Sequence, residues 1–327
     1  MAQVVQSRSH RYVAAVADNW QMAIWDMESQ RLLHVFETPQ GVYAANAAFA
    51  FNDDEKQIAF SAGTEAKVWD LASGQELKSV NLPPGFMDRM APDGQGRLLL
   101  VRQESLDSHS QPFGPNPDPQ KTPRVCRVRD LLGDEPSKAL VEFRDFPANT
   151  IQILMAPNAK WVAVEGLVYD GQTRKRAIRL FETLSGKERW TLSANFTLKT
   201  YLTDRFDALG KYVMIGTDSR EDNDLIEAES GRRIRQFDHS IPRVSADLVF
   251  GIRIGVDLRR DEKHRFSLVR NSGESTLVTL SGHEAETDSF SFSADGNWIT
   301  WGNRDGSVIV FDEQIVQRRL AELGLGW

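Results

Sequence analysis

The sequence predicts an all-β fold built from one unit that recurs seven times. The first observation is a short motif in which an aromatic or apolar residue precedes an acidic residue and a polar turn, as in Trp69-Asp70 and Phe181-Glu182. The second observation is spacing, because the motif's anchors stand at positions 25, 69, 129, 181, 226, 268 and 311. The steps between anchors are 44, 60, 52, 45, 42 and 43 residues. Repeats of about 40–45 residues with four short strands each are typical of a β-propeller, so we expect seven blades.

The third observation concerns the second strand of each unit, which is apolar at nearly every position. The clearest examples are residues 12–16, 57–60, 97–101, 161–164, 212–215 and 298–301. Continuous apolar runs of this length are typical of strands that are buried on both faces. We therefore expect Trp69 and Trp161 to be buried between neighbouring blades. Turn sequences such as Asp93-Gly94 precede these runs, because Gly tolerates the positive φ that tight turns need.

We expect a single domain, because each sheet of a repeat ring buries its faces only against its neighbours. The propeller is assigned to residues 1–312 and a C-terminal tail to residues 313–327. Its blades are expected at approximately 1–37, 42–80, 86–143, 150–192, 197–237, 241–280 and 285–312. In the tail, Val316, Leu320 and Leu323 follow an i, i+4, i+7 spacing, which favours a short amphipathic helix. The last blade is then expected to have three strands, or to take its fourth from residues upstream in a longer native chain.

The amino-acid composition limits the partners, the covalent and metal-binding chemistry, and the location that the protein can have. A net charge of −7, from 46 acidic and 39 basic residues, argues against general nucleic-acid binding, which needs a basic footprint. The single cysteine, Cys126, excludes an internal disulfide and a cysteine-based metal site. No run approaches the ~20 apolar residues of a membrane span, and the first residues lack the pattern of a signal peptide. We expect a cytoplasmic, monomeric protein that does not insert into membranes.

Catalytic and metal-binding patterns are not found in the sequence. There is no G-x-S-x-G nucleophile elbow and no phosphate-binding loop. The six histidines show neither H-x-x-x-H nor H-x-H spacing, so we expect no zinc site, no other metal and no cofactor. An active site assembled across blades is left open as an alternative, because fold alone does not define function.

The candidate binding residues lie between the second and third strands of a unit, where two units carry insertions. Residues 103–123 contain five prolines, which favour an extended loop, and residues 166–177 form the second insertion. The aromatic candidates are Trp20, Phe113 and Tyr169, and the basic candidates are Arg174, Lys175 and Arg176. Aromatic residues often anchor interfaces, and a basic cluster suits an acidic or phosphorylated peptide. The alternatives are a solvated hairpin for the charges and aromatic rings that cover their own blade.

Residues 282–312 resemble a WD40 repeat. Gly282-His283 opens the segment, Asp305-Gly306 forms a turn, and Phe311-Asp312 stands where the family usually has Trp-Asp. In that family, the histidine and the turn aspartate join a buried hydrogen-bond network with a Ser or Thr and the tryptophan. The resemblance assigns this structural role to His283 and Asp305. Phe311 cannot donate the indole hydrogen bond, so the network is expected to be incomplete.

The tail resembles the ends of divergent bacterial WD40 proteins, particularly those common in planctomycetes, where such a segment follows the last blade. Together with the predicted fold, this resemblance implies a non-catalytic scaffold that binds a protein or peptide through its loop-rich top face. One alternative is a propeller enzyme with a lactonase-like site in the channel. Another is a regulatory or sensory module of a larger bacterial signalling protein such as a Ser/Thr kinase.

Overall fold

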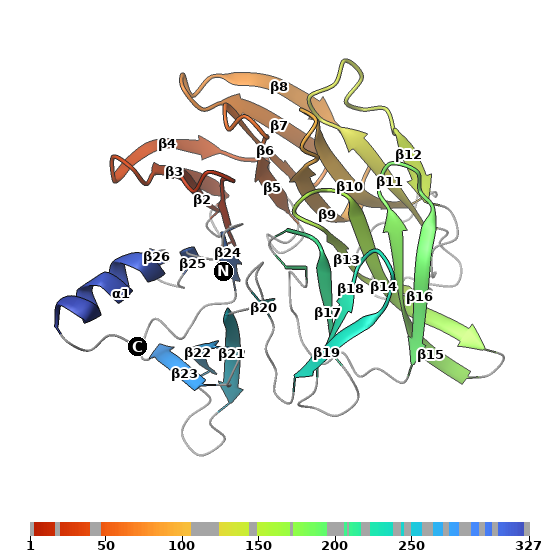
Figure 1. Ribbon diagram of the computed structural model, residues 1–327. Helices are drawn as coiled ribbons and strands as arrows, with labels where there is room; N and C mark the ends of the chain where they lie inside the picture. Colours follow the sequence, from red (N-terminus) through yellow and green to blue (C-terminus); the bar gives the residue numbers. More distant parts are fainter. Residues whose placement is uncertain are drawn as a thin grey trace. The chain divides into compact units, whose positions relative to one another are not determined.

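The computed structural model shows an all-β chain that divides into two compact units (Figure 1). One unit comprises Met1–Phe36 with Ile241–Trp327, and the other comprises Glu37–Ser240. The structure describes residues 3–16, 20–39, 47–105, 124–143, 149–170, 173–194, 206–207, 209–216, 223–237, 243–244, 250–256, 264–270, 275–280, 289–293, 298–302 and 307–323. The all-β class predicted from the sequence is thereby confirmed, whereas closure into a seven-bladed ring stays a prediction.

In the unit Glu37–Ser240, strands that follow one another in the chain pair as antiparallel neighbours. The first sheet comprises β5 (Ala48–Phe51), β6 (Gln57–Ala62), β7 (Glu65–Asp70) and β8 (Glu76–Asn81). The second comprises β9 (Gly85–Pro92), β10 (Leu98–Ser105), β11 (Arg124–Asp130) and β12 (Val141–Phe143). The third comprises β13 (Asn149–Met155), β14 (Trp161–Asp170), β15 (Thr173–Glu182) and β16 (Glu188–Ala194). The fourth comprises β17 (Tyr212–Gly216), β18 (Asn223–Glu227) and β19 (Arg233–Phe237).

The other unit repeats the same antiparallel pattern. Its first sheet comprises β1 (Gln3–Gln6), β2 (Tyr12–Val16), β3 (Gln21–Asp26) and β4 (Arg31–Glu37). A second comprises β20 (Arg243–Val244), β21 (Phe250–Val256), β22 (His264–Arg270) and β23 (Ser275–Leu280). The last comprises β24 (Ser289–Phe292), β25 (Trp298–Gly302) and β26 (Val308–Asp312). It has three strands among the residues that the structure describes.

The helix expected in the tail is present as α1 (Glu313–Glu322), which follows β26 directly. Asp312 caps its first turn, because one carboxylate oxygen accepts a hydrogen bond from the Ile315 N–H at 3.0 Å. Within the described part of the chain, no helix has both the length and the apolar character that a membrane span requires.

The repeated motif has one structural position in every sheet. The acidic residue of the motif, or the residue that replaces it, is the last residue of the third strand. It pairs with the first or second residue of the second strand. The paired positions are Tyr12 with Asp26, Gln57 with Asp70, Leu99 with Asp130, Trp161 with Glu182, Tyr212 with Glu227, Phe250 with Arg270 and Trp298 with Asp312. The degenerate copy at 129 therefore occupies the same register as the clear ones, whereas in the β20–β23 sheet the residue equivalent to the anchor is Val269, one position after the predicted 268.

The turn that follows the motif repeats as well. In three sheets a serine hydroxyl donates to the acidic residue three positions earlier, at 2.6–2.7 Å. These pairs are Ser73 with Asp70, Ser185 with Glu182 and Ser230 with Glu227. The next residue is a glycine with φ between 67° and 72°, a conformation in which an L side chain is disfavoured. This explains why Ser-Gly recurs in the sequence.

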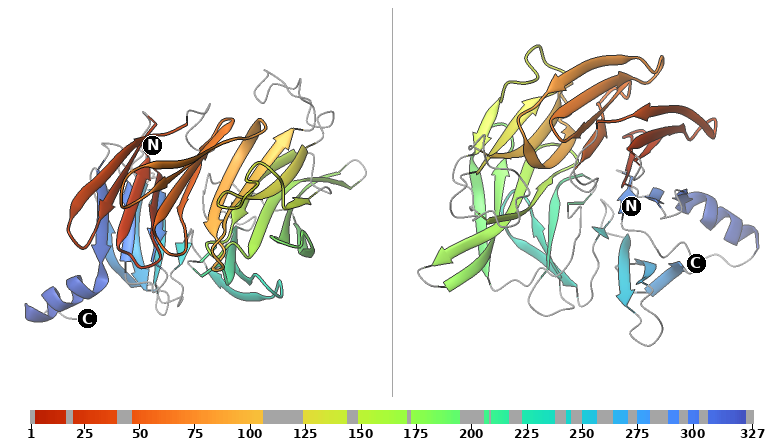
Figure 2. Two further views of the ribbon diagram at one scale, coloured as in Figure 1. Left: turned by 90° about the horizontal axis from the view of Figure 1, so that it is seen from above. Right: turned by 180° about the vertical axis from the view of Figure 1, so that it is seen from behind.

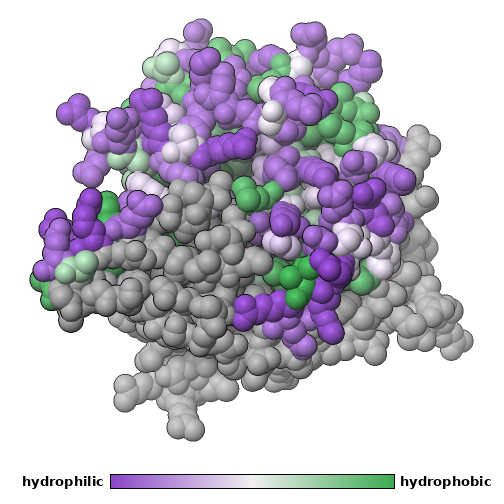
Figure 3. All heavy atoms as spheres, in the orientation of Figure 1, coloured by the Kyte–Doolittle hydropathy of each residue, from purple (hydrophilic) through white to green (hydrophobic). Residues whose placement is uncertain are grey.

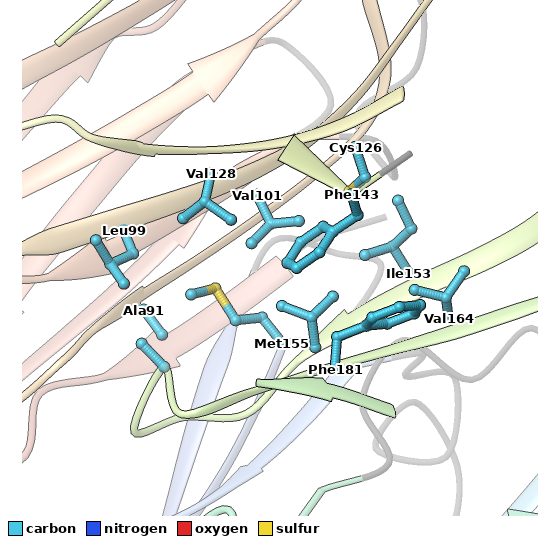
Figure 4. Packing of buried hydrophobic residues seen from close by; sticks show 12 residues of the cluster. Ala91, Leu99, Val101, Cys126, Val128, Phe143, Ile153, Met155, Val164 and Phe181 are labelled. Carbon is cyan, nitrogen blue, oxygen red and sulfur yellow. The ribbon is translucent and has the colours of Figure 1, made fainter. Parts of the chain in front are cut away.

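The sheets of the unit Glu37–Ser240 pack face to face through three apolar clusters. One joins the β5–β8 and β9–β12 sheets, the next joins β9–β12 and β13–β16, and the third joins β13–β16 and β17–β19. Figure 4 shows the middle cluster, where Phe143 lies near Phe181 at a ring distance of 5.2 Å. Trp69 and Trp161 are buried, as the sequence predicts. Cys126 is fully buried in the middle cluster, and burial raises the pKa of its thiol.

In two sheets the turn before the second strand contains an aspartate, Asp93 before β10 and Asp207 before β17, and their pKa values shift in opposite directions. At Asp93, burial alone would raise the pKa, but hydrogen bonds from the Gln95 N–H and from Arg97 outweigh it and lower the pKa. At Asp207, burial raises the pKa, although the N–H groups of Leu209 and Tyr212 donate to its carboxylate. The difference arises because Asp93 has the guanidinium of Arg97 beside it at 2.6 Å.

Replacing Trp161 with Ala should lower the free energy of unfolding by about 3–5 kcal/mol, because a large ring leaves a packed core. The ring is 2% exposed and lies between sheets with Leu180 and Val213. Thermal or urea unfolding measures the loss. Leu209→Ala is the control, since this side chain is 46% exposed and should change stability by about 0.5 kcal/mol or less. Equal losses in the two variants would contradict the assigned packing.

Replacing Asp207 with Asn tests the raised pKa. A carboxyl group whose pKa is higher in the folded state binds its proton more tightly there, so its stabilising effect is present in acid. That effect is lost as the pH rises through the folded-state pKa. The wild type should therefore gain stability relative to Asp207→Asn as the pH is lowered from about 7 to about 4. Urea unfolding across this range measures the difference, and a constant difference would contradict the shift.

Candidate protein-binding surface

The insertion expected at 166–177 is a β-hairpin, the form that the sequence left open as an alternative. β14 and β15 continue through it, with paired positions from Gly166 and Ala177 out to Asp170 and Thr173. The sequence contains the reason for this form: apolar and aromatic residues at 167–169 favour a strand, and Asp170-Gly171 favours a two-residue hairpin turn.

The outer part of this hairpin extends beyond its neighbouring strands. The pairing of β13 with β14 reaches Leu167, and the pairing of β16 with β15 reaches Arg176. Among the described residues, positions 168–170 and 173–175 pair only with each other. Figure 2 shows the two strands running past the rest of their sheet. Positions 168–170 and 173–175 thus form a two-stranded extension, called the finger below, of a sheet whose other end is buried.

The β14–β15 hairpin contains four of the six residues that the sequence predicts as binding residues. Tyr169 pairs with Arg174 and Lys175 pairs with Val168 in the finger, and Arg176 pairs with Leu167 at its base. Tyr169 and Arg174 therefore occupy directly opposed positions in the ladder. A binding role for these four residues stays a prediction.

Trp20, the fifth predicted residue, lies between β2 and β3 and is partly buried. Its φ is 62°, in the left-handed region that is costly for a bulky residue. The other described non-glycine residues with positive φ lie in the two turns that repeat from sheet to sheet. In the β5–β8 sheet, the connection between β6 and β7 uses Gly63, with φ 60°. A tryptophan is therefore present where the backbone favours glycine.

The remaining predicted residues are not described by the structure. Phe113 lies outside the described residues, and so do His283 and Asp305, so the WD40 hydrogen-bond network stays a prediction. In the part of the chain that is described, no group of three or more His, Cys, Asp or Glu residues is arranged to hold a metal ion.

A buried charged network, which was not predicted from the sequence, joins the β5–β8 and β9–β12 sheets. Arg102 of β10 forms a bidentate pair with Asp88 of β9, at 2.7 Å and 2.8 Å, and both side chains are at most 2% exposed. The hydroxyl of Ser61, in β6, donates to the same carboxylate at 2.7 Å. The guanidinium also donates to the carbonyls of Gly63 and Pro83, at 2.7 Å and 2.9 Å.

This network fixes two chain connections with one side chain. Gly63 lies between β6 and β7, and Pro83 lies between β8 and β9. Gly85 lies so close to the guanidinium side chain that an added Cβ would be 2.7 Å from Arg102 Cδ. The donors of Arg102 and the oxygens of Asp88 have hydrogen-bond partners, which is the condition under which buried charges are tolerated.

A second set of charges continues along the same strands. Glu104 is fully buried and contacts the guanidinium groups of Arg127, at 2.6 Å, and of Arg129. Arg127 also pairs with Glu142 of β12 at 3.1 Å. Beside it, the amide of Gln103 is buried and has no hydrogen-bond partner within the described structure. The available sequence signal is the run Arg102-Gln103-Glu104, which places three polar residues inside an otherwise apolar strand.

No protein-family model matches the chain, and no curated protein matches it. The resemblance to WD40 repeats therefore stays a prediction. The feature that bears on function is the geometry of the hairpin.

Replacing Asp88 with Ala should destabilise the protein by about 3–5 kcal/mol, because Arg102 would keep a buried charge without its partner. Replacing both partners, Asp88→Leu with Arg102→Met, should cost less than Asp88→Ala alone, since no unpaired charge remains. Urea unfolding of the single and double variants measures the two effects. A double variant that is less stable than Asp88→Ala would show that the unpaired charge is not the main cause of the loss.

Proposed function

We propose that this chain is a propeller-type scaffold that binds acidic peptide segments of partner proteins through the β14–β15 hairpin. The observation that supports this function is the finger itself, in which Tyr169 and Arg174, Lys175 and Arg176 occupy paired positions at and just inside a hairpin end that outruns its sheet. Three consecutive cations are unusual in a chain whose net charge is −7.

The chemistry of the finger suits an acidic ligand. Arginine forms bidentate, charge-assisted hydrogen bonds with carboxylates and phosphates, and tyrosine supplies a rigid amphipathic anchor. A two-stranded hairpin alone is marginally stable in water. Here its base is held by β13 and β16, and its inner residues Val164, Ala177 and Ile178 are buried. A rigid base limits the entropy that is lost when a ligand binds.

Trp20 supports a second anchor. Trp20 lies in the connection between the second and third strands of its own sheet, the type of connection in which the sequence predicts the binding residues. A left-handed conformation costs a non-glycine residue roughly 1–2 kcal/mol. Strained residues often lie at functional sites, so the conformation of Trp20 supports a binding role.

The test of the basic residues uses Arg174→Glu, Lys175→Glu and Arg176→Glu together. The probes are fluorescein-labelled synthetic peptides rich in Asp and Glu, with and without one phosphoserine. Fluorescence anisotropy should show binding to the wild type and a loss of roughly tenfold or more in the variant at low salt. The difference should shrink at high salt, because salt screens exposed charges.

The matched control reverses three exposed arginines elsewhere, with Arg232→Glu, Arg233→Glu and Arg235→Glu in and beside β19. It makes the same change in net charge, so retained binding shows that the hairpin and not the overall charge binds the peptide. A further variant, with Trp20, Phe113 and Tyr169 all changed to Ala, should lose capture of native partners while its melting temperature stays close to that of the wild type. Wild-type binding by both the basic and the aromatic variants would refute the proposal.

A further inference from the structure

The outer strand β4 (Arg31–Glu37) has an unusually apolar exposed surface. It is the terminal strand of its sheet, and Leu32, Leu33 and Val35 are exposed by 52%, 36% and 51%. Most of the described surface visible in Figure 3 is hydrophilic, with hydrophobic residues in small separate patches. Among the outer strands whose side chains the structure describes, no other has more than one exposed large apolar residue.

Two other outer strands show the contrast. β8 and β19 each have one exposed large apolar residue, Leu77 and Ile234. Their interiors carry charges, Lys78 in β8 and Arg235 in β19. Charges inside an edge strand are a common means of preventing edge-to-edge pairing. In β4, the Asp, Glu, Lys and Arg residues stand only at the two ends, as Arg31 and Glu37.

The sequence of β4, RLLHVFE, is complementary to itself when read in the opposite direction. If residue 34 is placed opposite its own copy, Arg31 faces Glu37, Leu32 faces Phe36 and Leu33 faces Val35. A shift by one residue or more in either direction places at least one of these charges opposite an apolar residue or beyond the pairing. A parallel arrangement would place Arg31 opposite Arg31 and Glu37 opposite Glu37, and opposed like charges are destabilising.

The same register also preserves the two faces of the strand. Side chains alternate between faces along a strand, so odd positions meet odd positions and even positions meet even ones. One face would combine Leu33 and Val35 of both copies between two Arg31–Glu37 pairs. The other would combine Leu32, His34 and Phe36 of both copies, and the His34 and Phe36 rings already stack at 5.4 Å within one chain.

We propose that two copies of this chain associate through β4, paired antiparallel about a two-fold axis at His34, so that their four-stranded sheets form one continuous sheet. This is an isologous contact, in which the same surface serves both partners. It departs from the monomer expected from the sequence and is independent of peptide binding by the hairpin. An edge of 7 residues buries little area, so the association should be concentration-dependent.

The main test is sedimentation equilibrium of the wild type and of charge variants between about 5 and 200 μM, a range suited to weak interfaces. Arg31→Glu and Glu37→Arg should each weaken self-association by roughly tenfold or more, because each variant opposes like charges at both ends of the pairing. An equimolar mixture of these two variants should form a heterodimer, and the double variant Arg31→Glu/Glu37→Arg should self-associate as the wild type does.

The controls separate pairing from changes in folding. Leu33→Lys with Val35→Lys should abolish association, whereas Leu77→Lys on β8 should leave it unchanged, and all variants should keep the far-UV circular dichroism of the wild type. His34→Cys should form an interchain disulfide with oxidised glutathione, because the axis places residue 34 opposite its copy. Leu32→Cys should not, because its copy is four residues away along the strand.

Three results would overturn the proposal. A wild type that sediments as a single monomer at every concentration would show that β4 does not bind a second copy, and an extended peptide of another protein would then be the alternative occupant. A dimer that persists in Leu33→Lys/Val35→Lys would place the interface elsewhere. Equal cross-linking of His34→Cys and Leu32→Cys would refute the register.

Discussion

The central constraint on this structure is that each sheet needs a neighbour on both faces. Second strands such as β10 and β14 are apolar on both sides, and alternate residues enter different clusters: Leu98 and Leu100 face one neighbouring sheet, whereas Leu99 and Val101 face the other. A sheet of this kind cannot be stable by itself, because half of its apolar surface would remain in water. Sheets that follow one another along the chain therefore have to pack together for their apolar residues to be buried.

Arg102 and Asp88 show how a charge is compensated inside this apolar stack. Arg102 pairs with Asp88 and also donates hydrogen bonds to backbone carbonyls in two connections. The ion pair thus holds these connections in place, as turn and capping hydrogen bonds do elsewhere. At the opposite extreme, Arg174 and Lys175 lie in the finger of β14 and β15, where positions 168–170 and 173–175 pair only with each other among the described residues. The same residue type is thus buried and paired at Arg102, and on the extended hairpin it is the basis of the proposed peptide binding.

The all-β class, the buried tryptophans and the tail helix could be predicted because each depends on local patterns that single chains display. The apolar run at 161–164 and the spacing of Val316 and Leu320 are examples. The hairpin at 166–177 could be given only as an alternative, because a long spacing between motifs fits an irregular loop and an extended strand pair equally well. The pairing of Arg102 with Asp88 was missed because the two residues are 14 positions apart and only strand register brings them together. His283, Asp305 and Phe113 lie outside the described residues, so the structure does not test them.

The environment of Cys126 gives this protein a built-in reporter. It is the chain's single thiol, it lies in the core between the β9–β12 and β13–β16 sheets, and its raised pKa keeps it protonated and unreactive. An alkylating reagent can reach it only when these sheets separate. The rate of labelling therefore measures how often this interface opens, without added probes or substitutions. Its comparison with the free energy of global unfolding distinguishes local separation of two sheets from unfolding of the whole chain.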